Sequence, residues 1–204
     1  MYKTITLALI GAGALMCTDA AAGRPVALSQ QPKAAYGPNI IRFTPVTVFD
    51  NSVGVGISYE RILDKDGKIG IHIPVYAGLN TNNSYYNGWG GYDTYANYSL
   101  FLNPGVKFYP AGQRKVTYAL GASLFTMLGD NDYYDGNIYE KESYLKAGIM
   151  INNSVHFNIT PKFNLGLELG VGPSYINQYH RANVTYNDGI GVSAQFGFHM
   201  GFRF

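Results

Sequence analysis

The residues of this chain whose types could support hydrolysis are its serines and histidines. Candidate groups are His72, His156, His180 and His199, with Ser154, Ser174 and Ser193. A serine nucleophile needs a histidine within hydrogen-bond reach and a third group that orients the ring. Ser154 and His156 stand two residues apart, which would place both on one face of a strand. This spacing alone does not define a catalytic pair, so hydrolysis is an alternative and not the main interpretation.

Charged residues form a second candidate group, because they recur on one side of alternating segments. The six are Arg42, Glu60, Lys107, Lys146, Glu168 and Arg203. Charges enclosed by a strand-built wall can form a proton or ion path. They can also pair with one another and fill a narrow interior, since each buried charge needs a partner. We expect the second arrangement, a paired network that plugs the interior.

The elements that must position these residues are strands, because nearly the whole chain after Pro38 alternates with a period of two. In the last segment, Phe198, Met200 and Phe202 fall on one face, opposite His199 and Arg203. The pattern predicts eight strands, an even number, at 39–49, 53–63, 69–79, 100–109, 116–128, 145–157, 163–172 and 190–204. The register of the first is the least defined, because Pro45 limits its ladder bonding.

The links between these segments alternate in length. Those at 64–68, 110–114 and 159–162 are short, whereas those at 80–94, 129–142 and 176–188 are long, polar and rich in tyrosine. In an antiparallel meander the two sets fall at opposite ends. The link at 50–52 is the exception, because it is short although it falls at the end that carries the long links.

The charges decide which side of the predicted barrel faces outward. A soluble barrel keeps apolar side chains inside and charges outside. Here the reverse assignment is favoured, because the face opposite the charges is almost uncharged and the charged face carries many small residues that fit a narrow interior. We therefore predict an all-β fold, an eight-stranded antiparallel up-and-down transmembrane β-barrel at 39–204.

The first residues indicate export. Lys3, an apolar run and the small residues Ala20 to Ala22 predict a signal peptide at 1–22, followed by an N-terminal periplasmic segment at 23–38. Cys17 raises lipidation as an alternative, although the bulky Met16 precedes it. Since Cys17 is the single cysteine, we expect no disulfide in the mature chain. The net charge of +2 argues against a nucleic-acid partner.

The end of the chain carries a family resemblance. Phe198, Met200, Phe202 and the terminal Phe204 resemble the C-terminal recognition strand of outer-membrane proteins. With the eight alternating segments, the chain resembles the small OmpA/OmpX-type barrels of Gram-negative bacteria, without their peptidoglycan-binding domain. The resemblance implies insertion into the outer membrane by the barrel-assembly machinery, with lipid and lipopolysaccharide as neighbours. The resemblance does not predict an activity, since fold does not imply function.

Two loops add binding candidates. Exposed rings at Tyr85, Tyr86, Trp89, Tyr92, Tyr133 and Tyr134 are expected either to contact an extracellular ligand or to belong to the membrane aromatic belt. Asp130, Asp132 and Asp135 would suit calcium, but their spacing departs from known calcium loops, so we expect a solvated acidic loop and no metal or cofactor.

The expected function is structural or surface-interacting, without enzymatic activity. Two alternatives remain open. One is a narrow porin-like solute or ion channel, and the other is a lipid A-modifying barrel enzyme, since some eight-stranded outer-membrane proteins deacylate or acylate lipid A.

Overall fold

The computed structural model describes residues 36–80, 84–86, 92–94, 97–134, 139–181 and 183–204. They are built from strands, as the alternating pattern predicts. The strands are β1 (Asn39–Phe49), β2 (Ser52–Ile62), β3 (Ile69–Asn80), β4 (Ser84–Tyr86), β5 (Tyr92–Thr94), β6 (Asn97–Leu102), β7 (Gly105–Phe108), β8 (Val116–Tyr134), β9 (Tyr139–Asn158), β10 (Phe163–Arg181), β11 (Val184–Asn187) and β12 (Gly191–Arg203). Within these ranges, no helix is long and apolar enough to span a membrane.

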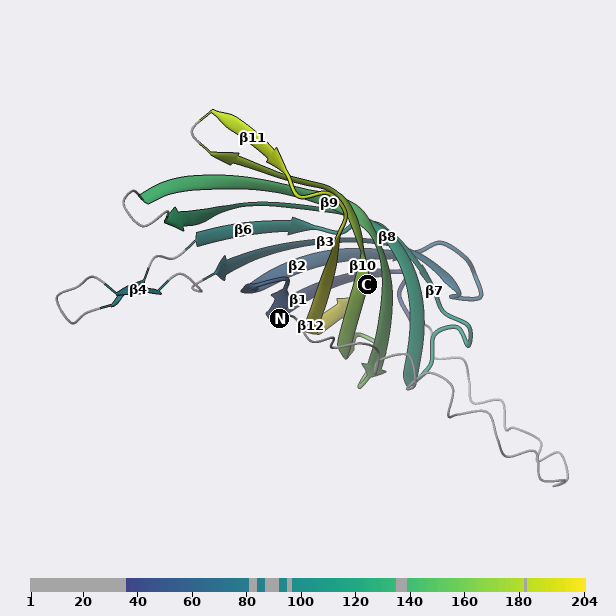
Figure 1. Ribbon diagram of the computed structural model, residues 1–204. Helices are drawn as coiled ribbons and strands as arrows, with labels where there is room; N and C mark the ends of the chain where they lie inside the picture. Colours follow the sequence, from purple (N-terminus) through teal and green to yellow (C-terminus); the bar gives the residue numbers. More distant parts are fainter. Residues whose placement is uncertain (1–35, 81–83, 87–91, 95–96, 135–138, 182) are drawn as a thin grey trace, which may run out of the picture. The chain divides into compact units, whose positions relative to one another are not determined.

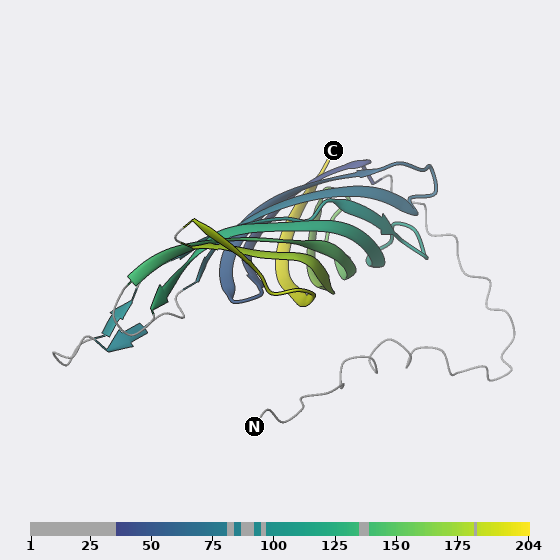
Figure 2. The same cartoon turned by 45° about the horizontal axis from the view of Figure 1, so that its top comes forward.

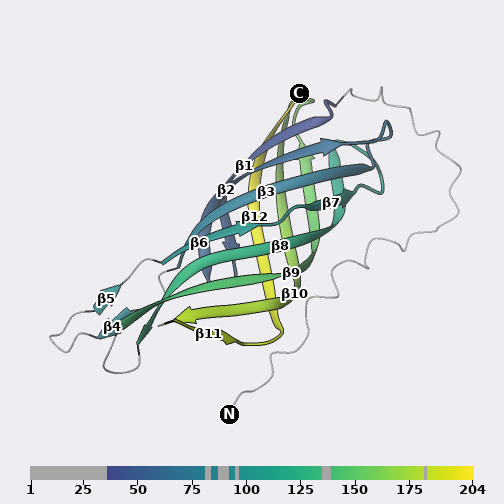
Figure 3. The same ribbon diagram turned by 90° about the horizontal axis from the view of Figure 1, so that it is seen from above.

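The barrel is closed, since each barrel strand pairs antiparallel with its neighbours in sequence and the last returns to the first. β12 pairs with β10 on one side and with β1 on the other, so that Ile40 lies opposite Arg203. In Figure 2 the purple first strand and the yellow last strand lie side by side. Figure 3 shows β12 between β10 and β1. The predicted eight-stranded antiparallel barrel is confirmed.

The fourth barrel strand is interrupted, which the sequence pattern did not predict. β6 and β7 pair with the same neighbours, β3 and β8, but Asn103 and Pro104 separate them. Proline lacks the N–H that a continuous ladder requires. The Pro104 carbonyl still accepts a hydrogen bond from Leu124 N at 3.0 Å, so the interruption remains attached to β8.

Pro45 has the local effect expected in β1. The register of β1 shifts around it against both partners, between Phe43 and Val46 on the β12 side and between Thr44 and Thr47 on the β2 side. A β-bulge leaves a residue unpaired, so a proline at the bulge removes no hydrogen bond of the ladder. The register before the bulge points Arg42 into the barrel, where the residue is 1% exposed.

Two segments expected to be long loops are largely strand, so those predictions were wrong. β8 and β9 stay paired out to Tyr134 and Tyr139, and β10 continues to Arg181. β10 then turns back into β11. Figure 1 shows these strands projecting past the other barrel strands on the side of the long links, which we call the loop end. Polar and tyrosine-rich composition resembled a loop because both faces of these extensions lack the apolar alternation of the barrel wall.

The opposite end, which we call the turn end, carries the short links at 63–68, 109–115 and 159–162. In the first of these, the Asp64 carboxylate accepts backbone hydrogen bonds from Ile69 N at 2.7 Å and from Lys68 N at 2.8 Å. These hydrogen bonds, with that from Ile69 the strongest, lower the pKa of Asp64. Gly67 completes the turn with a φ of 71°, in the left-handed region that favours glycine.

The turn predicts a pH-dependent contribution to stability. Because folding lowers the Asp64 pKa, its stabilising effect is fully present above the ordinary carboxyl pKa of about 4 and is lost as the pH falls through the lowered value. We expect Asp64→Ala to lower the unfolding temperature at pH 7, measured by heat-dependent gel mobility, and the difference from wild type to shrink in acid. Asp66→Ala is the matched control, and an equal loss in both variants would contradict a specific role of Asp64.

Candidate functional site

The outer surface of the barrel is apolar over its whole circumference. Large apolar side chains point outward from each barrel strand, including Ile57, Ile73, Leu124, Ile151, Leu167 and Phe196. Their alternate neighbours, among them Ser58, Ser123, Asn152 and Glu168, are buried inside. Contact of so large an apolar surface with water is unfavourable, whereas contact with lipid hydrocarbon is favourable. A closed barrel also leaves no unpaired strand edge within this belt.

A charge placed on this belt should destabilise the protein according to its depth. Leu167 lies on β10 within the apolar belt, between Leu165 and Leu169 of the same face, and is 44% exposed. We expect Leu167→Arg to reduce the free energy of unfolding in lipid vesicles by about 2–4 kcal/mol. The matched control is Leu63→Arg, at the turn end, where the expected cost is about 0–1 kcal/mol. Equal costs, measured by urea titration, would contradict a belt in contact with hydrocarbon.

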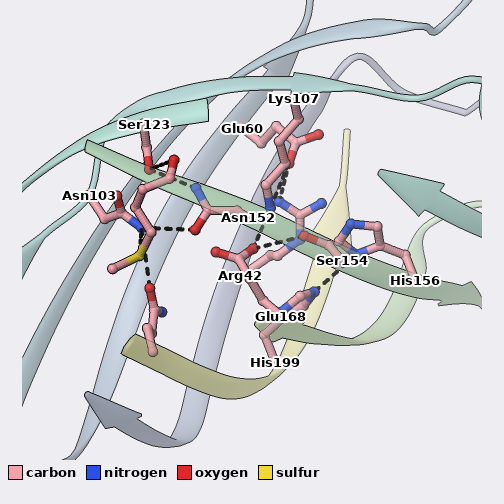
Figure 4. Close-up of polar contacts among 12 residues, drawn as sticks. Arg42, Glu60, Asn103, Lys107, Ser123, Asn152, Ser154, His156, Glu168 and His199 are labelled. Carbon is pink, nitrogen blue, oxygen red and sulfur yellow. Dashed lines mark hydrogen bonds and ion pairs between the residues drawn. The ribbon is translucent and has the colours of Figure 1, made fainter. Parts of the chain in front are cut away.

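Four of the six predicted charged residues meet in the interior. Arg42 Nη1 donates to Glu60 Oε2 at 2.6 Å, and Lys107 Nζ donates to Glu168 Oε2 at 2.5 Å. Lys107 Nζ also lies 3.9 Å from Glu60 Oε2, which joins the two pairs. Figure 4 shows the four side chains converging from different barrel strands. Each is at most 3% exposed, so they form one buried ionic cluster.

The other two predicted charges make no ion pair with this cluster. Lys146 is half-buried near the loop end, where its Nζ pairs with Asp50 Oδ2 at 3.0 Å. Asp50 also accepts hydrogen bonds from Ser193 Oγ and from Ala194 N. Arg203 lies at the turn end, where Nη2 donates to Gln113 Oε1 at 2.5 Å. The interior charges therefore form three groups that no ion pair connects.

Amide side chains fill the interior next to the ionic cluster. Asn103 Nδ2 donates to Gln195 Oε1 at 3.2 Å and to Asn152 Oδ1 at 3.3 Å. Asn152 Nδ2 in turn donates to Ser123 Oγ at 2.6 Å (Figure 4). Asn103 is the first residue of the interruption between β6 and β7, so this break supplies a side chain to the interior network.

An aromatic cluster occupies the interior toward the loop end. Phe101 is fully buried and stacks on Phe49 at 5.2 Å and on Tyr76 at 5.8 Å between ring centroids. Phe125 packs against Phe101 at 5.9 Å. The remaining members are Met127, Tyr144 and Met150. This cluster, which we call the aromatic plug, fills the interior with apolar side chains between the amides and the loop-end rim.

The candidate Ser154 and His156 both face the interior, but each has a different partner. Ser154 Oγ donates to Glu168 Oε2 at 3.2 Å, and His156 Nδ1 lies 3.0 Å from His199 Nε2 (Figure 4). His156 is fully buried. The geometry does not assemble a serine nucleophile with its base, because no hydrogen bond joins the hydroxyl to the imidazole.

The remaining candidates are placed as follows. Phe202 and Phe204 point outward, at 54% and 56% exposure, and Phe198 and Met200 share that face of β12. The loop tyrosines are placed by backbone position only, in β4, β5 and β8. Trp89, Asp135 and the predicted signal peptide with Cys17 lie outside the described residues. Asp130 and Asp132 stand on β8, paired opposite Ser143 and Lys141.

Sequence reasoning missed two parts of the interior. Tyr109 is fully buried and its hydroxyl donates to Glu60, so that it belongs to the interior network. Phe49, Phe101 and Phe125 interrupt the small or polar face with large rings. The aromatic plug could have been predicted from the positions of these rings, because all three are inward-facing and lie near the same end of their strands.

The comparisons with known proteins rest on structure. No protein-family model matches the chain, and no curated protein sequence does. A major outer-membrane protein from Thermus thermophilus is similar with a TM-score of 0.59 and 12% identity, over 81% of this chain and 98% of that one. Ail, the attachment invasion locus protein of Yersinia pestis, gives 0.52 and 11%, over 83% and 99%. OprG of Pseudomonas aeruginosa gives 0.52 and 10%, over 83% and 96%.

The chain therefore has the fold of the small outer-membrane β-barrels. The predicted resemblance to the OmpA/OmpX type is confirmed at the level of fold. Within this fold, the described part of the chain holds the interior ionic cluster and the aromatic plug, and several of its strands project at the loop end.

Proposed function

We propose that the protein is exported, spans the outer membrane as a plugged barrel, and presents its projecting strands at the cell surface for interaction. The observation that carries the surface role is the sheet extension at the loop end. There β10 pairs with β11, and all four residues of β11 are exposed. Val184 and Tyr186 offer exposed apolar or aromatic surface on this extension. A strand with an exposed edge can pair with a partner chain.

The orientation follows from the two ends of the barrel. Outer-membrane barrels keep short turns in the periplasm and longer loops outside. On this basis β11 lies outside the cell, whereas the link with Asp64 and Asp66 faces the periplasm. Ail, one of the similar structures, is named for attachment and invasion, which agrees with a surface role for this fold.

Cysteine labelling tests the proposed location and orientation, because Cys17 belongs to the leader and the mature chain has no other cysteine. The fractionated outer membrane should contain the protein, with gel mobility that changes on boiling. Val184→Cys should react with a membrane-impermeant maleimide on intact cells. Asp66→Cys, exposed at the turn end, should react only after lysis. Recovery in a detergent-free soluble fraction, or labelling of both variants on intact cells, would contradict the proposal.

The plugged interior separates this proposal from the channel alternative. Burial of the ionic cluster and stacking of the aromatic plug favour a barrel that does not conduct. In planar bilayers we expect the wild type to give no regular conductance steps. Stable steps in the wild type would favour the channel instead. A change in lipid A mass on overproduction would favour the enzyme alternative, for which the separate partners of Ser154 and His156 give no support.

A further inference from the structure

Two arginines lie together on the inner face of β1 and β12, near the turn end. Arg42 is paired in register with Gly201, and Arg203 stands two residues further along β12. Residues in this diagonal relation share one face, within reach of long side chains. Both arginines are 1% exposed. The fold therefore encloses two guanidinium groups in one region of the interior.

Each guanidinium has donors without a hydrogen-bond partner among the described residues. Arg42 Nη1 is bound to Glu60, but Arg42 Nε and Nη2 have no hydrogen-bond partner. Arg203 Nη2 is bound to Gln113, but Arg203 Nε and Nη1 have none. Buried donors are nearly always satisfied by protein, water or a ligand. The four nitrogen atoms are therefore available to donate hydrogen bonds to an acceptor from outside the protein.

The charges in this part of the interior are unbalanced. Glu60 is shared by Arg42 and Lys107, and Glu168 binds Lys107. Within the described residues, no carboxylate lies within ion-pair distance of Arg203. Its guanidinium is covered instead by the ring of Tyr36, at 5.2 Å from the centroid. Water can satisfy the free donors, but it does not compensate a buried charge.

The surrounding residues leave a further donor in the same place. Asn164 lies opposite Gly201 on β10, is fully buried, and has no partner for either its Nδ2 or its Oδ1. Gly201 places no side chain between Asn164 and Arg42, and a Cβ there would lie 2.5 Å from Asn164 Oδ1. Toward the turn end, Gln113 joins Arg203 to the carbonyl of Gly67, at 3.1 Å from its Nε2, and so bridges three parts of the barrel mouth.

We propose that this region binds a small free oxyanion, of the class of inorganic phosphate or sulfate, between Arg42 and Arg203. Guanidinium groups bind such anions through parallel N–H donors, and the unused Nε and Nη2 of Arg42 form such a pair. Arg203 offers its Nε and Nη1 as two single donors on different edges of its guanidinium. Asn164 Nδ2 supplies an additional neutral donor. Gln113 covers the site from the turn end and must move for the ion to enter.

Inorganic phosphate is the probe for the first measurement, on the whole folded protein in detergent. Equilibrium dialysis with radiolabelled phosphate should give saturable binding of one ion per chain, displaced by sulfate but not by equal chloride. Phosphate should also raise the temperature of the heat-dependent mobility change, because a ligand that binds only the folded state stabilises it. Absence of saturable binding by the wild type up to about 10 mM, a concentration that reveals even weak sites, would overturn the proposal.

Variants locate the binding. Arg203→Gln should weaken phosphate binding by about tenfold or more, the loss expected for one charge-assisted hydrogen bond. The matched control is Arg61→Gln, an exposed arginine near the same end of β2, which should bind as the wild type does. Equal weakening in both variants, or undiminished binding by Arg203→Gln, would overturn the assignment. Should Arg203→Gln fail to fold, Asn164→Leu provides the second test, with reduced binding expected and unchanged binding against the site.

Discussion

Glu60→Gln is expected to destabilise the folded barrel by about 3–5 kcal/mol, because it removes one partner of a buried ion pair and leaves the other charged. Glu60 is fully buried and accepts hydrogen bonds from Arg42 and from Tyr109, with Lys107 Nζ at 3.9 Å. The neutral amide keeps the shape of the side chain but not its charge. Urea titration of the protein in lipid vesicles measures the change.

A matched variant separates burial from charge. Glu140 lies near the loop end, where it pairs with Arg181 at 3.8 Å and its side chain is 39% exposed. Glu140→Gln should cost less than about 1 kcal/mol, as exposed pairs do. The combined variant Arg42→Met with Glu60→Met should recover most of the loss, because it removes both charges together. A double variant as unstable as Glu60→Gln would show that the pair is not the source of the effect.

Phe101→Ala should cost about 3–5 kcal/mol, the range for truncating a buried aromatic ring. Phe101 is fully buried at the centre of the aromatic plug, in contact with Phe49, Tyr76 and Phe125. The alanine leaves a cavity that the rigid barrel wall cannot close. Urea titration of the folded fraction measures the loss.

The control for this variant is the adjacent residue. Leu100 points outward from the same strand and is 40% exposed. Leu100→Ala should be several-fold less costly, because lipid chains can occupy the space that the shorter side chain leaves. A larger loss at Leu100 than at Phe101 would mean that the interior of the barrel does not hold the packed plug described above.

The sequence was sufficient for the barrel because alternation with a period of two assigns every wall residue to one of two faces. The outward belt and the inward position of Glu60, Lys107 and Glu168 follow directly from it. The length of β8 and β9 beyond the barrel could not be predicted, because the sequence of these extensions lacks the apolar alternation of the barrel wall.

The alternating pattern also could not predict which inward side chains contact one another. Alternation shows that a side chain points inward but not its height relative to residues of distant strands. For that reason Lys146 was grouped with the ionic cluster, whereas the register places it near Asp50 at the loop end. The interruption after Leu102 was equally hidden, since Pro104 is compatible with either a strand end or a break.

The pairing of β1 with β12 has a kinetic consequence. Ile40 and Arg203 meet across this seam although almost the entire barrel sequence lies between them. Contacts of such high sequence separation form slowly, because the chain must first surrender the entropy of a very large loop. Until they form, β1 and β12 each present an open edge that can pair with other chains. Closure of the seam is therefore the step at which a chaperone that shields unpaired edges would have the greatest influence on the yield of folded protein.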